Sequence, residues 1–205
     1  MSDASLSSPP RKRVPPTATR AKVKDVTRVM IIERGLNEVK ARMVAKAAAV
    51  SVGTVYNLFG HLDELIREIN GETYDDLFAT ETDALAAARA ESEDVRAHLS
   101  ALADAYLTWV GENMSLWLAT LAFNRSRGES PDWYAAKEAR LLAIIEDALE
   151  GSLPPGDIPP AARALWASIH GIVTMSLGAR GFAVEPARTR EQMQFIIDAV
   201  ADRLD

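Results

Sequence analysis

The sequence predicts an all-α protein. Apolar residues recur at the three- and four-residue spacing of amphipathic helices along most of the chain after Thr19. No segment keeps the alternation of apolar and polar residues that is typical of a β-strand. Helix-start and helix-stop residues divide the pattern into about nine segments. We therefore expect a small N-terminal helical domain followed by a larger helical bundle.

The N-terminal segment, residues 1–18, is rich in serine and proline, and we expect it to form a disordered arm. The arm carries a basic run, Arg11, Lys12 and Arg13. The first helix is expected to start with Thr19 as its N-cap and to end at Gly35, because threonine and glycine favour these positions. Its inward face should comprise four residues, Val23, Val26, Met30 and Ile31.

The stretch AKAAAVSVGTVYNLFGHLDEL, which begins at Ala45, is interrupted in its middle by Ser51 and Gly53. Glycine in a helix interior costs roughly 1 kcal/mol relative to alanine, whereas serine favours an N-cap. The sequence therefore predicts a short helix over about 40–48, a turn, and a second helix over 52–59 that Ser51 caps. This pattern is typical of a helix-turn-helix.

Six further helices are expected from about 62 and over about 92–112, 114–125, 131–150, 161–180 and 189–204. The pair Ser130-Pro131 is a helix-start signal, and Thr189 with Gln192 fits a capping box. The predicted domains are the arm over 1–18, the helix-turn-helix domain over 19–70, and a helical domain over 71–205.

Composition limits the class of protein. The chain of 205 residues has no cysteine and only three scattered histidines, so we expect neither disulfides nor a bound metal. The N-terminus lacks the apolar core of a secretory signal. The longest uncharged run, residues 164–179, is shorter than the ~18 residues that suggest a membrane span. A cytoplasmic protein without a cofactor is expected.

Charge is distributed unevenly along the chain. Residues 1–61 contain 11 Lys and Arg against four Asp and Glu, a net charge of +7. The whole chain carries −6, so the other 144 residues carry −13. A basic segment on an acidic body is typical of a module that binds nucleic acid, although uneven charge also arises by chance.

The second helix of the turn pair offers two different faces. Val55, Leu58 and Phe59 form an apolar face suited to the domain core. On the other side Gly53 leaves room for a DNA backbone, and hydroxyl and amide groups suit phosphates and base edges. The candidate DNA-binding residues are Arg42, Lys46, Ser51, Val52, Gly53, Thr54, Tyr56, Asn57 and His61, together with Arg11, Lys12 and Arg13 of the arm.

This segment resembles the N-terminal domain of the TetR family of one-component transcriptional repressors. The matching positions, spread over about 20–70, are Gly35, Val44, Ala45, Ala48, Val50, Ser51, Gly53, Thr54, Tyr56, Phe59 and Leu65. Ala49 replaces the usual turn glycine, which costs on the order of 1 kcal/mol in a left-handed conformation. Lys40, Val52 and Leu62 also depart from the family pattern. The resemblance implies a homeodomain-like unit that reads a pseudo-palindromic operator in double-stranded DNA.

The same resemblance implies that the C-terminal helices bind a small-molecule effector and form a homodimer. The candidates for the effector pocket are Tyr106, Trp109, Trp117, Leu121, Phe123, Trp133 and His170, although such residues also fill helical cores. Trp166, His170 and Gly171 resemble the Trp-His-Gly element that names a TetR subgroup. The last two helices are expected to form a four-helix dimer interface through Trp166, Val173, Met193, Ile196, Ile197 and Val200.

The predicted function is that of a dimeric, sequence-specific DNA-binding repressor that a small apolar or aromatic ligand releases from DNA. Two other classes stay open at this point. An enzyme would need a nucleophile–base pair or a phosphate loop, and none stands out. The carboxylate pairs Asp75-Asp76 and Glu146-Asp147 are adjacent in sequence, so their side chains diverge around a helix. A helical adaptor would instead use the N-terminal unit to contact another protein.

Overall fold

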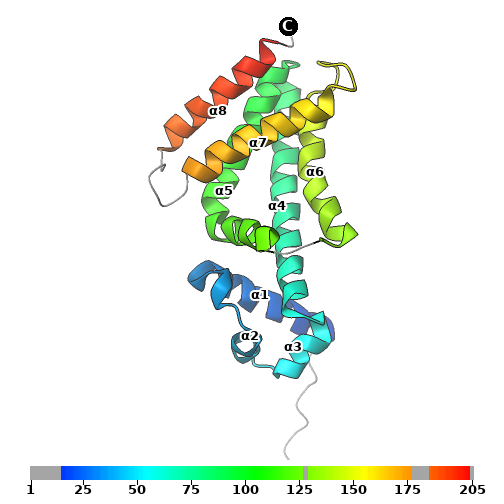
Figure 1. Cartoon of the computed structure of the whole chain (residues 1–205), viewed down its shortest axis with the longest axis vertical. Coiled ribbons are helices and arrows are strands. Elements are labelled where there is room, and N and C mark those ends of the chain that lie inside the picture. Colours follow the sequence, from blue (N-terminus) through cyan, green and yellow to red (C-terminus); the bar gives the residue numbers. More distant parts are fainter. Residues whose placement is uncertain (1–14, 127–128, 177–184, 204–205) are drawn as a thin grey trace, which may run out of the picture. The chain divides into compact units, whose positions relative to one another are not determined.

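The computed structural model describes residues 15–126, 129–176 and 185–203. Within these ranges the chain forms eight α-helices and one 3-10 helix and contains no strand, which confirms the predicted all-α class (Figure 1). The chain divides into two compact units between Leu65 and Ile66. This division falls inside the long helix α4 (Leu62–Glu91), the helix that also contains the boundary expected between residues 70 and 71.

The N-terminal unit contains α1 (Pro16–Arg34), the 3-10 helix η1 (Leu36–Glu38), α2 (Ala41–Ala48) and α3 (Val52–Phe59) (Figure 1). Helices α2 and α3 agree with the segments predicted from the sequence. Helix α1 packs against η1, α2 and α3. The buried apolar side chains of this unit are Val23, Met30, Ile31, Val39, Val44, Ala45, Ala48, Val55, Phe59 and Leu65.

Helix α1 differs from the prediction at its start and on its inward face. It begins at Pro16, because proline is well suited to the first helical position, and Thr19 lies in the first turn rather than at the cap. Residues 16–18 therefore belong to α1, not to the arm. Thr27 is fully buried in place of the half-buried Val26, and its hydroxyl donates to the carbonyl of Val23 at 2.7 Å.

The turn between α2 and α3 is closed by two capping arrangements. The Ser51 side chain accepts a hydrogen bond from the backbone N–H of Thr54 at 3.0 Å, which confirms the predicted N-cap. Ala49 adopts the left-handed conformation, with φ 56° and ψ 44°. The backbone N–H of Val50 then donates to the carbonyl of Ala45 at 2.9 Å, a bond typical of a Schellman motif.

Replacing Ala49 with glycine is expected to stabilise the free protein by about 0.5–1 kcal/mol, because glycine adopts the left-handed conformation without strain. Ala47→Gly provides the control, since Ala47 is an exposed residue inside α2. Glycine there should destabilise by about 1 kcal/mol. Thermal unfolding followed by circular dichroism measures both, and two variants of equal stability would contradict the account of the turn.

The C-terminal unit comprises α4 from Ile66 onward, α5 (Val95–Ser126), α6 (Asp132–Ala148), α7 (Ile158–Ser176) and α8 (Pro186–Ala201). Helix α8 packs against α5 and α7, and α6 packs against the same two helices (Figure 1). One hydrophobic cluster joins residues from all five helices. It includes Tyr74, Leu77, Leu102, Tyr106, Trp117, Tyr134, Ile145, Leu165, Val173, Met193 and Ile197.

Two segments of this unit differ from the predicted helices. The helices expected over 92–112 and 114–125 form the single element α5, which is interrupted by the non-helical φ and ψ of Asn113, −114° and 20°. This merger brings the described α-helices to eight rather than about nine. Thr189 does not cap α8, which begins at Pro186. Instead its side chain is buried and its hydroxyl donates to the carbonyl of Glu185 at 3.2 Å.

Gly71 allows a close approach between α4 and α6. A Cβ atom at this position would lie 3.0 Å from Cζ3 of Trp133 and 3.3 Å from Cδ of Lys137. The glycine is therefore explained by side-chain packing within the C-terminal unit. No helix in the described part of the chain combines the length and the apolar character that a membrane crossing requires.

Candidate DNA-binding face and effector cavity

Helix α3 presents an exposed polar face opposite the side that enters the core. Val55 and Phe59 are buried, whereas Tyr56 is 46% exposed and Asn57 is also exposed. Ser51, Gly53 and His61 are exposed as well, and Val52 and Thr54 are half-buried. The hydroxyl, amide and imidazole groups that a nucleic acid could contact are thus accessible on this side of the helix.

The position of α3 depends on a basic residue that the sequence analysis did not single out. The Arg20 guanidinium on α1 donates to the backbone carbonyl of Leu58, at the C-terminal end of α3. The same group lies 4.2 Å from the centroid of the Phe59 ring, within the range of a cation–π contact. Arg20 therefore fixes the end of α3, in addition to its contribution to the positive charge of this unit.

Gly53 has no structural requirement inside the chain. Its φ lies outside the left-handed range, and a Cβ atom added there would make only an ordinary contact, 3.6 Å from the Ser51 hydroxyl. Neither strain nor crowding within the described chain explains why the first turn of α3 contains the residue that is poorest in helix propensity after proline. The glycine leaves the helix surface open to an approach from outside.

Two basic side chains on α2 are also available to an external ligand. Arg42 and Lys46 are exposed, and neither forms a salt bridge or hydrogen bond with another side chain or backbone group that the structure describes. Being four residues apart, they share one side of α2. Lys40, by contrast, donates to the carbonyl of Asn37 at 2.7 Å. The predicted arm residues Arg11, Lys12 and Arg13 lie outside the described residues.

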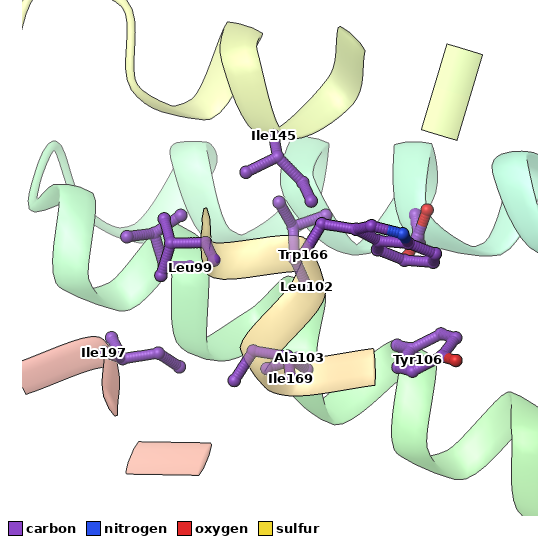
Figure 2. Close-up of a pocket in the computed structure, with 10 residues that line it drawn as sticks. Leu99, Leu102, Ala103, Tyr106, Ile145, Trp166, Ile169 and Ile197 are labelled. Carbon is purple, nitrogen blue, oxygen red and sulfur yellow. The ribbon is translucent and has the colours of Figure 1, made fainter. Parts of the chain in front are cut away.

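The C-terminal unit contains a narrow apolar cavity with about 390 Å³ of empty space. Figure 2 shows that side chains of α5, α6, α7 and α8 surround it. It is lined by Leu99, Leu102, Ala103, Tyr106, Ile145, Leu165, Trp166, Ile169 and Ile197, with Glu81 of α4 as the one acidic member. Of the residues predicted for an effector pocket, only Tyr106 lines this cavity.

A second cavity, with about 920 Å³ of empty space, contains three other predicted pocket residues, Trp117, Leu121 and His170. Trp166 lines both cavities. Its ring stacks on His170 with centroids 5.2 Å apart, and Nδ1 of His170 lies 2.7 Å from the Tyr106 hydroxyl. Burial, followed by the positive charge of Arg125, lowers the pKa of His170, so the neutral imidazole accepts the Tyr106 proton.

Three predicted pocket residues line neither cavity. Trp109 is 5% exposed, and its indole N–H donates to the Asp76 carboxylate at 2.7 Å. Phe123 is buried beneath the guanidinium of Arg67. Trp133 packs over Gly71 and is 41% exposed. These aromatic side chains have structural contacts in the C-terminal unit, as residues in a helical core commonly do.

Half of the residues predicted for a dimer interface are buried within the chain itself. Val173, Met193 and Ile197 are at most 2% exposed, so they have little surface left for a partner. Trp166, Ile196 and Val200 are half-buried and pack against the same core. The apolar side chains that α7 and α8 expose are instead Met175, at 53%, and Phe195, at 72%. The amphipathic pattern of α8 located its inner face and missed Phe195.

The carboxylates considered for an enzyme have structural partners or none that suggests catalysis. Asp75 forms salt bridges with Lys137 and Arg140, whereas the adjacent Asp76 accepts the Trp109 hydrogen bond. The two side chains thus diverge as predicted. Within the described ranges, no three His, Asp or Glu residues are placed to hold a metal ion.

Glu81 is the site residue that the sequence analysis missed. It occupies the buried stripe of α4 midway between Leu77 and Leu85, at four-residue spacing. These three side chains are at most 3% exposed. A carboxylate at the centre of an apolar helical stripe was the signal available in the sequence, because charged residues are almost never fully buried without a partner.

Two family models match this chain. The model described as "Bacterial regulatory proteins, tetR family" matches residues 24–69, which contain α2 and α3. The model described as "Tetracyclin repressor-like, C-terminal domain" matches residues 99–200. No curated protein matches the chain. The assignment to a Trp-His-Gly subgroup stays a prediction.

Several solved structures are similar over most of their length. A protein of unknown function from Rhodococcus sp. RHA1 has a TM-score of 0.71 at 19% identity, covering 95% of this chain and 96% of its own. A TetR transcriptional regulator from Rhodococcus sp. RHA1 has a TM-score of 0.66 at 17% identity, with 90% and 96% covered. A TetR-like transcriptional regulator from this organism has a TM-score of 0.60 at 20% identity, with 92% and 99% covered. These likenesses show the shared fold.

Proposed function

The chain belongs to the TetR family of bacterial regulatory proteins, which makes it a DNA-binding transcriptional regulator rather than an enzyme, and from this premise we propose that it acts as a homodimeric repressor. In this proposal each subunit inserts α3 into the major groove of one half of a pseudo-palindromic operator. A small apolar or aromatic molecule, bound in the C-terminal unit, releases the DNA. A cytoplasmic location follows from this role.

The exposed face of α3 is the observation that supports DNA reading most strongly. Gly53 gives close access to the start of the helix, and Asn57 and Tyr56 project exposed polar groups on the same helix. An asparagine amide can form two hydrogen bonds with an adenine edge, and a tyrosine hydroxyl can hold a phosphate. Arg42 and Lys46 on α2 add positive charge for the phosphate backbone.

Dimer formation is supported by the exposed apolar residues of the last two helices. Phe195 and Met175 are large apolar side chains that a monomer would leave in water. A two-fold dimer places two recognition helices one helical turn of DNA apart, or a multiple of it. Ligand release further requires that the ligand bind the DNA-incompetent state more tightly than the DNA-bound state.

A gel-shift assay on the promoter region of the protein's own gene, with a salt titration, tests DNA binding. Deleting residues 1–13 removes Arg11, Lys12 and Arg13 but leaves Pro16, where α1 begins. If all three arm residues bind phosphates, the slope of log K against log salt should flatten by roughly 0.9 for each phosphate that the shortened arm no longer neutralises. A slope that does not change would show that the arm does not contact DNA. No shift with the full chain at low salt would contradict the proposed function.

A further inference from the structure

Glu81 is buried in the C-terminal unit without a partner for one of its oxygens. The side chain is 3% exposed, and Oε2 has no hydrogen-bond partner among the residues that the structure describes. Buried polar atoms in native proteins are nearly always hydrogen-bonded, so an exception needs an explanation. Because Glu81 lines the narrow cavity of Figure 2, the missing partner can come from a molecule bound in that cavity.

The residues around the cavity do not supply this partner. Tyr106 is the other titratable residue that lines it, and burial raises the pKa of its hydroxyl far above the usual value. That hydroxyl accepts from the indole N–H of Trp117 at 3.1 Å and lies 2.7 Å from His170 Nδ1, so its own proton has an acceptor. The lining residues from α6, α7 and α8 are aliphatic side chains and Trp166. Within the described ranges, no basic side chain lines the cavity.

We propose that this cavity binds a small molecule with a protonated amine and an aromatic or aliphatic body, and that Glu81 is the counter-ion of the amine. The inference rests on the proposed function, in which an effector binds in the C-terminal unit, and it specifies the chemical class of that effector. An ammonium group has only donors, so it matches an unpaired carboxylate oxygen. The apolar walls match the body of the ligand, while an anionic ligand would be repelled by Glu81.

Binding of such an amine displaces a proton. Burial raises the pKa of Glu81 to about 8, so its carboxyl is mostly protonated at pH 7 in the empty cavity. The amine enters as R–NH₃⁺, the carboxyl loses its proton to the buffer, and the complex contains R–NH₃⁺ paired with a carboxylate. About one proton per site is therefore released at pH 7. Trp166, which is half-buried and lines both cavities, is the side chain whose movement gives the ligand body more room.

Three probes with one common body test the inference on the full chain in the absence of DNA. They are 4-phenylbutylamine, 4-phenylbutanol and 4-phenylbutyrate, which are cationic, neutral and anionic at pH 7. Isothermal titration calorimetry is performed in phosphate and in Tris buffer. We expect the amine to bind at least about tenfold more tightly than the other two. Its binding enthalpy should differ between the buffers by the amount that the release of about one proton requires.

Glu81→Gln is the decisive variant, because it keeps the size of the side chain and removes the charge. It should remove both the preference for the amine and the proton release, while the alcohol binds as before. Asp83→Asn is the matched control, since Asp83 is an exposed carboxylate two residues farther along α4. Equal affinities for the three probes, no binding of the amine, or an amine preference that survives Glu81→Gln would each overturn the inference.

The outcomes for the cavity and for DNA binding are separable. Calorimetry without DNA reports only on Glu81 and its cavity, whereas the gel shift reports only on the N-terminal unit and the dimer. Amine binding without an operator shift would refute the proposed function and retain the cavity. An operator shift without amine binding would retain the function and refute the assignment of the ligand.

Discussion

Replacing Gly53 with alanine is expected to weaken operator binding about tenfold or more and to leave the free protein at least as stable as before. A tenfold loss corresponds to about 1.4 kcal/mol. The added methyl group meets no close atom in the chain, since the nearest is 3.6 Å away, so it is accommodated in the free protein. Alanine also has the better helix propensity, by up to about 1 kcal/mol. Only a ligand that approaches α3 closely would meet the methyl group.

Gly111→Ala is the control for this experiment. Gly111 is an exposed glycine inside α5, and a Cβ atom there would meet nothing within 4 Å. It should gain stability like Gly53→Ala but keep full operator affinity. Thermal unfolding and a DNA-binding titration are measured on both variants. If Gly53→Ala binds the operator as tightly as the wild type, DNA does not approach this part of α3.

Replacing Phe195 with glutamate is expected to convert the dimer to a monomer and to abolish measurable operator binding. Phe195 is 72% exposed, so the change should not disturb the core of the subunit. In the proposed dimer it would place an unpaired charge in an apolar interface, at a cost of several kcal/mol. Ile196 is a less informative position, because it is half-buried and packs against the core.

Leu118→Glu provides the matched control for Phe195→Glu. Leu118 is an exposed apolar residue of α5, at 43% exposure, and lies outside the two helices proposed for the interface. Sedimentation velocity should show a dimer for this variant and a monomer for Phe195→Glu, with unchanged helix content in both. A dimeric Phe195→Glu variant would place the subunit interface elsewhere on the chain.

Local signals in the sequence were strong enough to locate the helix-turn-helix. Ser51 and Gly53 cannot both lie in the interior of a single regular helix without cost, so the turn and the bounds of α3 followed directly. Proline gave the competing signal at the helix starts that were placed wrongly. Pro16 and Pro186 each occupy the first helical position, three residues before Thr19 and Thr189, which had been expected to cap.

The C-terminal site was harder to predict because periodicity identifies a buried face without identifying what covers it. Met193 and Ile197 form the apolar stripe of α8, yet this stripe packs against α5 and α7 of the same chain. Aromatic residues such as Trp109 were likewise expected in a pocket and lie in the core. The location of a cavity depends on how five helices pack, and only its one misplaced charge, Glu81, was visible in the sequence pattern.

The central claim is that α3 reads the bases of an operator, and the most direct measurement compares operator and random DNA for two variants. Asn57→Ala should cost about 1–3 kcal/mol on the operator and much less on random DNA, because it removes a contact to a base edge. Tyr56→Phe removes one hydroxyl from the exposed face and should weaken binding to both DNAs equally, as the removal of a phosphate contact does. If Asn57→Ala weakens binding to the two DNAs by the same factor, or by none, then α3 does not read the sequence of the operator.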